Sequence, residues 1–428
     1  MKGYTLISCI GTGIYNKNSG YRKTVYQFPD NGKKYETSLF LKAIIDTEYR
    51  LIKKVVLVGT FTSGWDMLIP NPDSEENIHL WGKILDECEN KEKGISKESI
   101  IELESRLSGW YNNIPFKIAT HTDELKYENV ENVFSTYMKI PDLLEPNTDI
   151  LFDISHGFRS MPILVFQSLQ LNASKIFGRK VEVIYGEYIK KEQISHVRDL
   201  SKYWDFYEIS SAIKLFEEKF DGKLLAEKIK PYWESGAKFL SRFTEIVECN
   251  FSLQIYEALN QFKNSLSNYN EKGKPQWVTD VKNSLYEIYK KLSQNADEKY
   301  PIAKTVWEYS KLLREKKLIT QAVIALQVAV ETAITEKIDP SKIGDYDWFR
   351  TAYAISYGLK ENAYQKLKKI HQNNSKLKNL ERLRNHIAHG GSKNKGDYPH
   401  LSNIPSVPSV LKSIDNAMHE LFLILDEE

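Results

Sequence analysis

The spacing of apolar and polar residues divides the chain into two halves. In the first 200 residues, short apolar runs bounded by turn residues predict buried strands. These strands lie at 5–11, 55–60, 116–120, 149–155 and 181–188. Helix-like stretches lie between them, at roughly 37–52, 75–110, 128–144 and 160–177. Strands that alternate with helices predict an α/β fold, with a parallel sheet covered by helices on both faces.

The second half carries no strand signal after about Tyr203 and is predicted to be all-α. Segment 319–335 is apolar around much of its circumference, which predicts a central core helix. Loop-forming residues gather at 268–275 and 392–407. The predicted helices lie at 207–247, 251–270, 276–294, 302–317, 319–337, 345–357, 361–388 and 407–426.

Length and composition limit the classes of protein to consider. A chain of 428 residues is too long for one ordinary core, so two or three domains are expected. The net charge is only +2, so any RNA-binding surface must be a local patch. The three cysteines are far apart, which favours neither a disulfide framework nor a cysteine zinc site. With no apolar run of membrane-spanning length and no signal peptide, we expect a cytoplasmic protein without a membrane partner.

The first predicted strand ends in a glycine-containing loop, CIGTGIY. Gly11 and Gly13 would let the backbone approach a phosphate closely. A dinucleotide-binding loop needs a third glycine and an immediate helix, whereas here Asn16 and a basic hairpin at 21–37 follow. Nicotinamide binding is therefore disfavoured.

Two other strand ends carry polar or aromatic residues. The second strand leads into hydroxyl groups that suit phosphates or sugars, and into Trp65, which fits either a base-stacking or a core position. The last strand of this half ends at Gly186 and Glu187, where a turn and a ligand contact are equally compatible. The hydroxyl residues of the second loop are Thr60, Thr62 and Ser63.

The sequence DISHGFRSMP at 153–162 is the sharpest feature of the first half. It predicts a strand, a turn and a helix start, and the free N–H groups of a helix start favour anions. Arg159 would add charge-assisted contacts to such an anion. Ser155 and His156 suggest a nucleophile and a base, but adjacent residues rarely face each other and no orienting acid is evident. Anion or nucleotide binding is favoured over a hydrolase.

The run RLRNHIAHGG near the end of the chain combines a permanent cation with a titratable imidazole. Arg384 offers a rigid fork of donors for phosphate, and His389 can move protons near neutral pH. Asn385 and His389 are four apart and share a helix face, whereas Arg384 lies about 140° away from His389. One helix thus provides a broad polar surface, but it cannot form a closed site by itself.

Two other interpretations of this run stay open. An Arg–His pair on a charged helix is usually an ordinary surface feature. His386 and His389 have a spacing that metal ligands can adopt, but no suitable third ligand is evident nearby.

Taken together, these motifs resemble two known families. GTG-x-Y, the basic hairpin leading into Thr37, VGT and DISHGFRS resemble the CARF sensor domain of CRISPR-associated proteins. The C-terminal R-N-x-x-x-H resembles the HEPN ribonuclease motif. A sensor followed by HEPN is similar to the auxiliary ribonucleases of type III CRISPR systems. The resemblance covers about three quarters of the chain, and 205–300 is matched only as helical.

The resemblance implies a Rossmann-like CARF domain at 1–203, a helical connector or HEPN insertion at 204–300 and an all-α HEPN core at 301–428. It also implies a homodimer, or a higher homo-oligomer, that binds cyclic oligoadenylate as an allosteric activator, with tetra-adenylate favoured. The ring-contacting residues would be Gly11, Thr12, Gly13, Tyr15, Thr60, Thr62, Ser63, Trp65, Ser155, His156, Gly157, Arg159 and Ser160.

For the helical half, the resemblance implies a metal-independent, cofactor-free endoribonuclease for single-stranded RNA in antiviral defence. Arg384, Asn385 and His389 from two protomers would form one site that leaves 2′,3′-cyclic phosphate and 5′-hydroxyl ends. Some relatives slowly cut their own activator, and Thr12, Ser63 or Trp65 would then position the ring. The rival hypothesis is a non-catalytic, nucleotide-sensing regulator that binds nucleic acid.

Overall fold

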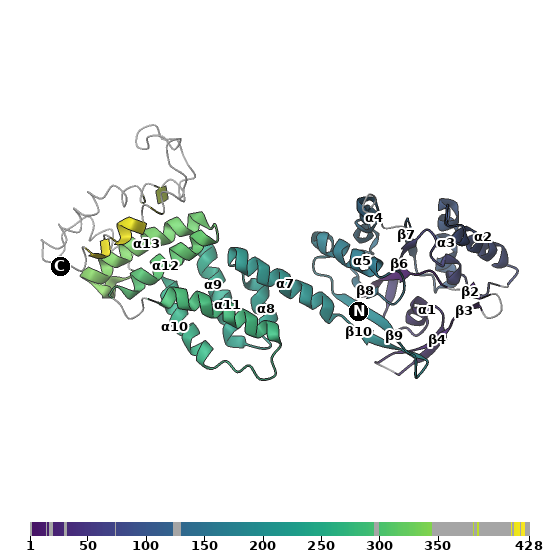
Figure 1. Cartoon of the computed structure of the whole chain (residues 1–428), viewed down its shortest axis with the longest axis horizontal. Coiled ribbons are helices and arrows are strands. Elements are labelled where there is room, and N and C mark those ends of the chain that lie inside the picture. Colours follow the sequence, from purple (N-terminus) through teal and green to yellow (C-terminus); the bar gives the residue numbers. More distant parts are fainter. Residues whose placement is uncertain are drawn as a thin grey trace, which may run out of the picture. The chain divides into compact units, whose positions relative to one another are not determined.

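The chain folds into two compact units, Met1–Tyr207 and Glu208–Glu428, called here the sheet unit and the helical unit (Figure 1). The predicted boundary at 203/204 lies within a few residues of this division, and a further division at 300 stays a prediction. The computed structural model describes residues 2–13, 15–16, 20–29, 32–72, 74–122, 130–294 and 299–344, and beyond them Leu380, Leu383, Arg384, Lys412, 415–419 and 421–423.

The sheet unit contains ten described strands. They are β1 (Tyr4–Ile10), β2 (Tyr15–Asn16), β3 (Gly20–Tyr21), β4 (Thr24–Gln27), β5 (Lys34–Thr37), β6 (Ile52–Thr60), β7 (Phe116–His121), β8 (Asp149–Asp153), β9 (Val181–Ile189) and β10 (Ile194–Asp199). Eight of them form one sheet in the order β5-β4-β10-β9-β8-β1-β6-β7, and β2 pairs with β3. The five strands predicted from the apolar runs are confirmed as its parallel part, β9-β8-β1-β6-β7.

Helices cover both faces of the sheet, as the alternation of elements predicts. Their bounds are α1 (Phe40–Asp46), α2 (Ile78–Glu89), α3 (Lys97–Trp110), α4 (Val130–Tyr137), α5 (Ser160–Leu171) and α6 (Ala173–Ile176), with 3-10 turns η1 (Trp65–Leu68) and η3 (Ile140–Leu143). Leu6 and Ile10 of β1 pack with α1, α2 and α3, whereas Ile7 and Cys9 pack with α4, α5 and α6. This period of two is what a strand buried on both faces requires.

The strand order creates a switch point beside β1. After β1 the chain forms the hairpin β4–β5 at the far edge of the sheet, and then proceeds through α1, α2 and α3 to β6 and β7 on one side of β1. It then returns to β8 on the other side of β1, and reaches β9 through α5 and α6. The segments that follow β1 and β8 therefore diverge to opposite faces. In open α/β sheets, ligands bind at such a crevice outside the carboxyl ends of the strands.

The sheet is mixed, so the expectation of a parallel sheet was incomplete. The basic hairpin predicted at 21–37 is present as β4 and β5, but it joins the main sheet through β10. β10, with the sequence ISHVRD, was missed because its apolar positions are few. It is antiparallel to β9, and it pairs Ile194 with Val25, a contact that no local pattern encodes.

The helical unit is all-α throughout its described part, as predicted. Its helices are α7 (Lys202–Lys219), which begins in the sheet unit, α8 (Lys223–Ile229), α9 (Glu234–Cys249), α10 (Gln254–Ser267), α11 (Gln276–Ser293), α12 (Pro301–Glu315) and α13 (Ile319–Ile338), followed by the 3-10 turn η4 (Pro340–Lys342). The single helix predicted at 207–247 is three helices. Phe220 has a left-handed backbone before Gly222, and Pro231 follows α8.

One hydrophobic cluster runs through the helical unit. The prediction of a central core helix is confirmed, since α13 buries Ala322, Leu326, Val330 and other residues against α12. Leu380, Leu383, Ala417, Met418, Leu421 and Phe422 belong to the same cluster. The predicted helix 345–357 lies outside the described residues, as do most of 361–388 and 407–426. In the part that the structure describes, no helix is long and apolar enough to cross a membrane.

Candidate ligand-binding site

Loops that follow β1, β6 and β8 meet at the carboxyl ends of these parallel strands. We call them the first loop (11–13), the second loop (61–64) and the third turn (154–159). The backbone N–H of Gly64 donates to the carbonyl of Gly11 over 2.9 Å. A Cβ added at Gly11 would lie 2.9 Å from the backbone nitrogen of Gly157. The first loop is therefore in contact with both of the others.

Glycine is required at the point where the first loop meets the third turn. Gly157 has φ +96°, a conformation that L side chains rarely adopt, and an added Cβ there would lie 2.9 Å from Met161 Sδ. The added Cβ of Gly11 would meet backbone atoms, which cannot rotate away. Two glycines 146 positions apart in the chain thus allow two backbones to touch at the switch point.

The second loop supports the site from inside the fold. Ser63 Oγ donates to the carbonyl of Ile10 over 2.8 Å and accepts the N–H of Thr60 over 2.8 Å. The indole N–H of Trp65 donates to the carbonyl of Thr60 over 2.9 Å. Thr60, Ser63 and Trp65 are at most 1% exposed, so the structure favours the core interpretation of Trp65 over base stacking. Thr62 is half-buried.

The third turn is fixed by a buried carboxylate. Asp153 is fully buried and accepts from Ser8 Oγ over 2.7 Å and from the N–H of Ser155 over 2.8 Å. Ser155 Oγ in turn accepts the N–H of Gly186 over 2.7 Å, which ties the turn to β9. Ser155 is therefore engaged in holding the turn, an arrangement that does not favour a nucleophile.

His156 joins the third turn to the hairpin and to α1. Its Nε2 lies 3.4 Å from the N–H of Phe40, which donates to it, and 3.2 Å from Tyr26 Oη. A ring nitrogen that accepts from a backbone N–H must be unprotonated. Burial lowers the pKa of His156, and the nearby Asp153 carboxylate partly opposes that effect. A neutral imidazole is thus built into the turn.

The outward-facing groups of the three loops suit an anion. Thr12, Gly13, Gly157 and Arg159 are exposed, and Ser160 begins α5. The first turn of α5 holds no acidic residue, so its N–H groups and the Arg159 guanidinium present positive potential together. Among the residues that the structure describes, no group of three His, Cys, Asp or Glu side chains is placed to hold a metal ion.

Two residues beside the loops were not singled out from the sequence. Asp66, next to Trp65, accepts from the hydroxyl of Tyr21 with both carboxylate oxygens, over 2.9 and 2.7 Å. Tyr21 lies in β3, opposite Tyr15 of β2. Forty-five positions separate Tyr21 from Asp66, so no spacing rule connects them.

The second half contributes one described residue of its predicted site. Arg384 is helical and half-buried, next to Leu383 in the core. Asn385 and His389 lie outside the described residues. Further along the chain, Asp415 accepts from the indole N–H of Trp307 over 3.1 Å and from Arg314 over 2.5 Å, both in α12.

Comparisons with known proteins agree with the architecture of the sheet unit. Residues 5–192 match the family described as CRISPR system endoribonuclease Csx1, CARF domain. The chain is 21% identical over 437 residues to CRISPR-associated protein MJ1674 of Methanocaldococcus jannaschii. That alignment covers 96% of this chain and 66% of the relative, so the chain spans just under two thirds of its length. Both findings support a CRISPR-associated protein with a CARF domain.

A solved structure, Enterococcus italicus Csm6 bound to cyclic hexa-2′-fluoro-hexa-dAMP, aligns with 99% of this chain and 94% of its own. Its sequence identity is 13% and its TM-score is 0.36. A score of this size does not establish a common fold over the whole chain.

Proposed function

We propose that this protein is an endoribonuclease of type III CRISPR defence that is switched on by cyclic oligoadenylate. The observation that carries the proposal is the CARF match over residues 5–192. It coincides with the unit in which three loops meet at a topological switch point. The matched family is described as the CARF domain of an endoribonuclease, which supports a nuclease in the rest of the chain.

In this proposal the ring contacts the outward-facing backbone and side chains of the first loop and the third turn. Thr12, Gly13, Gly157 and Arg159 are exposed there, and a phosphate of the ring would meet the start of α5. Arg159 would add a charge-assisted contact. Thr60, Ser63 and Trp65 would act indirectly, because they are buried and hold the second loop in place. Cyclic tetra-adenylate is the ring size that the resemblance favours.

We also propose that two copies of the chain pair through the sheet unit. Segment 160–174, which contains α5, carries no charged residue. Ile163 and Leu171 of α5 are 59% and 67% exposed, and Phe177 beyond it is 91% exposed. A surface of this kind favours burial against a partner. Because α5 begins in the third turn, a second copy placed there would bring its own third turn near the first.

The proposed chemistry takes place in the helical unit and uses groups of both copies. The 2′-hydroxyl of the RNA attacks the adjacent phosphorus, and a His389 imidazole accepts its proton. The bond from phosphorus to the 5′-oxygen breaks, and that oxygen takes up a proton from the second imidazole. Arg384 stabilises the charge on the phosphorane, and Asn385 orients the histidine or the phosphate. The products carry 2′,3′-cyclic phosphate and 5′-hydroxyl ends, and DNA is not a substrate.

The decisive experiment incubates single-stranded RNA with the protein in chelator, with and without each size of cyclic oligoadenylate, and identifies the product ends. We expect cleavage only with a ring, and 2′,3′-cyclic phosphate ends. Ring binding without RNA cleavage would favour the non-catalytic regulator, which a duplex-DNA shift assay would then examine. Linear products from the ring alone would reveal an additional ring-nuclease activity.

A further inference from the structure

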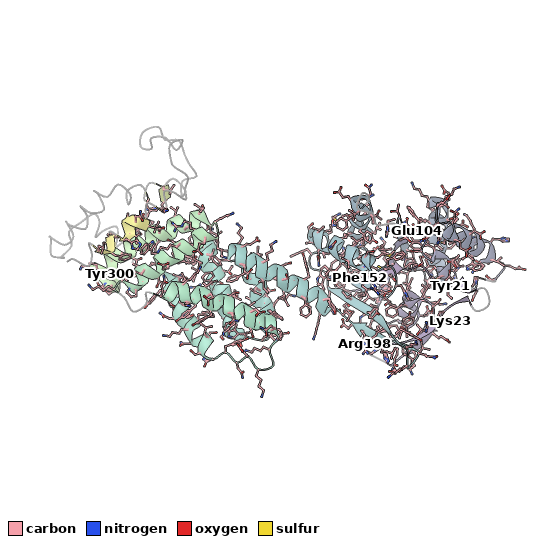
Figure 2. All side chains as sticks on the ribbon, viewed as in Figure 1. Tyr21, Lys23, Glu104, Phe152, Arg198 and Tyr300 are labelled. Carbon is pink, nitrogen blue, oxygen red and sulfur yellow. The ribbon has the colours of Figure 1, made fainter. Side chains whose placement is uncertain are left out.

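Asp66 is a buried carboxylate that none of the recognised motifs explains. It is 1% exposed, and burying a charged carboxylate is costly unless hydrogen bonds compensate for lost water. Its two oxygens accept from the hydroxyl of Tyr21, and the side chain of Trp81 also donates to it. Burial raises the pKa of Asp66, and these hydrogen bonds oppose the rise. The carboxylate is thus held at one end of a specific contact with Tyr21, labelled in Figure 2.

The ring of Tyr21 lies directly against the first loop. A Cβ added at Gly13 would lie 2.5 Å from Tyr21 Cε1 and 2.6 Å from Met67 Sδ. A Cβ added at Gly64 would lie 3.3 Å from the backbone nitrogen of Gly13. On the side where a Cβ would point, Gly13 therefore contacts a tyrosine from β3, a methionine from η1 and the second loop, while the residue itself is exposed.

These contacts of the first loop matter for ligand binding. A loop with glycines at two of its three positions has much conformational freedom to lose, and that loss weakens binding unless the loop is already ordered. Strand β2, just after the first loop, pairs with β3, and Tyr15 lies opposite Tyr21 in that pair. The hydrogen bond from Tyr21 to Asp66 anchors β3 to η1.

We propose that Tyr21 and Asp66 are positioning residues of the ligand-binding site. Tyr21 lies against the first loop and Asp66 holds Tyr21, so their hydrogen bond keeps Gly11–Thr12–Gly13 in the shape that receives the ligand. The identity of the ligand, cyclic oligoadenylate, rests on the proposed function. The role of the pair in ordering the loop rests only on the contacts described above.

A control pair lies at the opposite end of the strands. Tyr4, at the start of β1, donates its hydroxyl to Glu182 over 2.7 Å, and Glu182 is 6% exposed. Here too a tyrosine hydroxyl donates to a buried carboxylate, at the amino ends of the strands, and Glu182 is in addition paired with Arg50 and Lys180. If Tyr21 has a purely structural role, Tyr21→Phe and Tyr4→Phe should change ring affinity equally. If Tyr21 positions the first loop, only Tyr21→Phe should weaken ring binding.

The test measures ring binding by calorimetry, and thermal unfolding, for the full-length wild type and for each variant, with cyclic tetra-adenylate and cyclic hexa-adenylate as probes. We expect Tyr21→Phe to weaken binding roughly tenfold, within the contribution of one hydrogen bond to a charged group. Tyr4→Phe should stay within about twofold of wild type, even where both variants unfold at similar temperatures. Asp66→Asn keeps an acceptor oxygen for Tyr21 and should bind the ring more tightly than Asp66→Ala. Equal affinities for Tyr21→Phe and Tyr4→Phe would overturn the proposal.

A second readout needs no ligand. Amide hydrogen exchange of 11–16 should be faster in Tyr21→Phe than in wild type, and unchanged in Tyr4→Phe. Unchanged exchange in Tyr21→Phe would refute the ordering role, whatever the ligand is. A wild type that binds no ring yet shows faster exchange on Tyr21→Phe would contradict the proposed ligand and leave the ordering of the loop supported.

Discussion

The sheet unit and the helical unit build their candidate sites in opposite ways. In the sheet unit, Gly11, Gly64, Gly157 and Gly186 come from four separate loops or strands, and their backbones touch or bond to neighbouring loops. In the helical unit, the candidate catalytic residues fall within 384–389, on a segment whose Leu383 is part of the core. The first site depends on the geometry of backbones, and the second depends on the functional groups of a few side chains.

This difference has a measurable consequence. Small additions of volume should damage the site of the sheet unit, because its loops are in van der Waals contact. The candidate site of the helical unit should respond to loss of charge or of a proton carrier, with little effect on folding. Activator binding and RNA cleavage should therefore be separable by mutation.

The largest effect is expected in the helical unit. Arg384→Ala and His389→Ala should each lower ring-activated RNA cleavage by roughly a hundredfold or more, because each removes charge stabilisation or proton transfer from the transition state. Ring affinity should stay at the wild-type value. Arg242→Ala removes an exposed arginine paired with Glu245 and serves as the control. Cleavage that survives in Arg384→Ala would remove this residue from the catalytic assignment.

The next prediction concerns the backbone contact between Gly11 and Gly157 in the sheet unit. Gly11→Ala places a methyl group 2.9 Å from the backbone of Gly157, and overpacking of this kind costs roughly 1–3 kcal/mol. We expect a lower free energy of unfolding and at least tenfold weaker ring binding. Gly82→Ala is the control, since its Cβ would meet nothing within 4 Å in α2 and should stabilise the helix. Wild-type ring affinity in Gly11→Ala would show that this contact does not shape the site.

A smaller effect is expected from Arg159→Ala. The side chain is exposed, so its loss should leave the unfolding temperature unchanged. Ring affinity should fall by about tenfold, the size of one charge-assisted hydrogen bond, and its dependence on salt concentration should become weaker. Titration at two salt concentrations measures both changes. Arg198→Ala, at another exposed arginine of the same unit, is the comparison. Equal affinities of the two variants would place Arg159 outside the ring site.

The smallest effect concerns pH. The pKa of His156 is lowered by burial below that of the unfolded chain, which is about 6.5. Below that pH the unfolded chain binds the proton more readily than the folded one. The contribution of His156 to stability is therefore complete above pH ~7 and declines as the pH falls below about 6.5. Denaturant unfolding of wild type and His156→Gln between pH 7.5 and 5.5 should show a steeper decline for wild type. Parallel curves would argue against a neutral, buried imidazole.

Much of this architecture was predictable from local patterns. The five parallel strands and the core helix α13 follow from apolar runs, because burial on two faces or all round a helix leaves a direct mark in composition. The helix ends near Gly222 and Pro231 were not predicted, and 207–247 was predicted as one continuous helix. The strand β10 was missed because its apolar positions are few, and its place in the sheet depends on pairing with β4, more than 160 residues earlier.

The location of the candidate site was predictable from the sequence, but the roles of its residues were not. The motifs located the first loop, the second loop and the third turn, all of which meet in the structure. Burial then changed the parts that residues play in them. Ser63 and Trp65 turn inward, Ser155 and His156 bind backbone and hairpin, and Arg159 stays outside.

Local sequence patterns were enough to predict the five parallel strands and the core helix α13, since apolar periodicity acts over neighbouring residues. The sequence also determined which loops carry glycine, hydroxyl and guanidinium groups. Which of those groups face outward depends on tertiary packing, and so do the contacts of Tyr21 with Asp66 and of Gly11 with Gly157. Burial and contact between distant segments depend on the order of strands in the whole sheet, which no short stretch of sequence records.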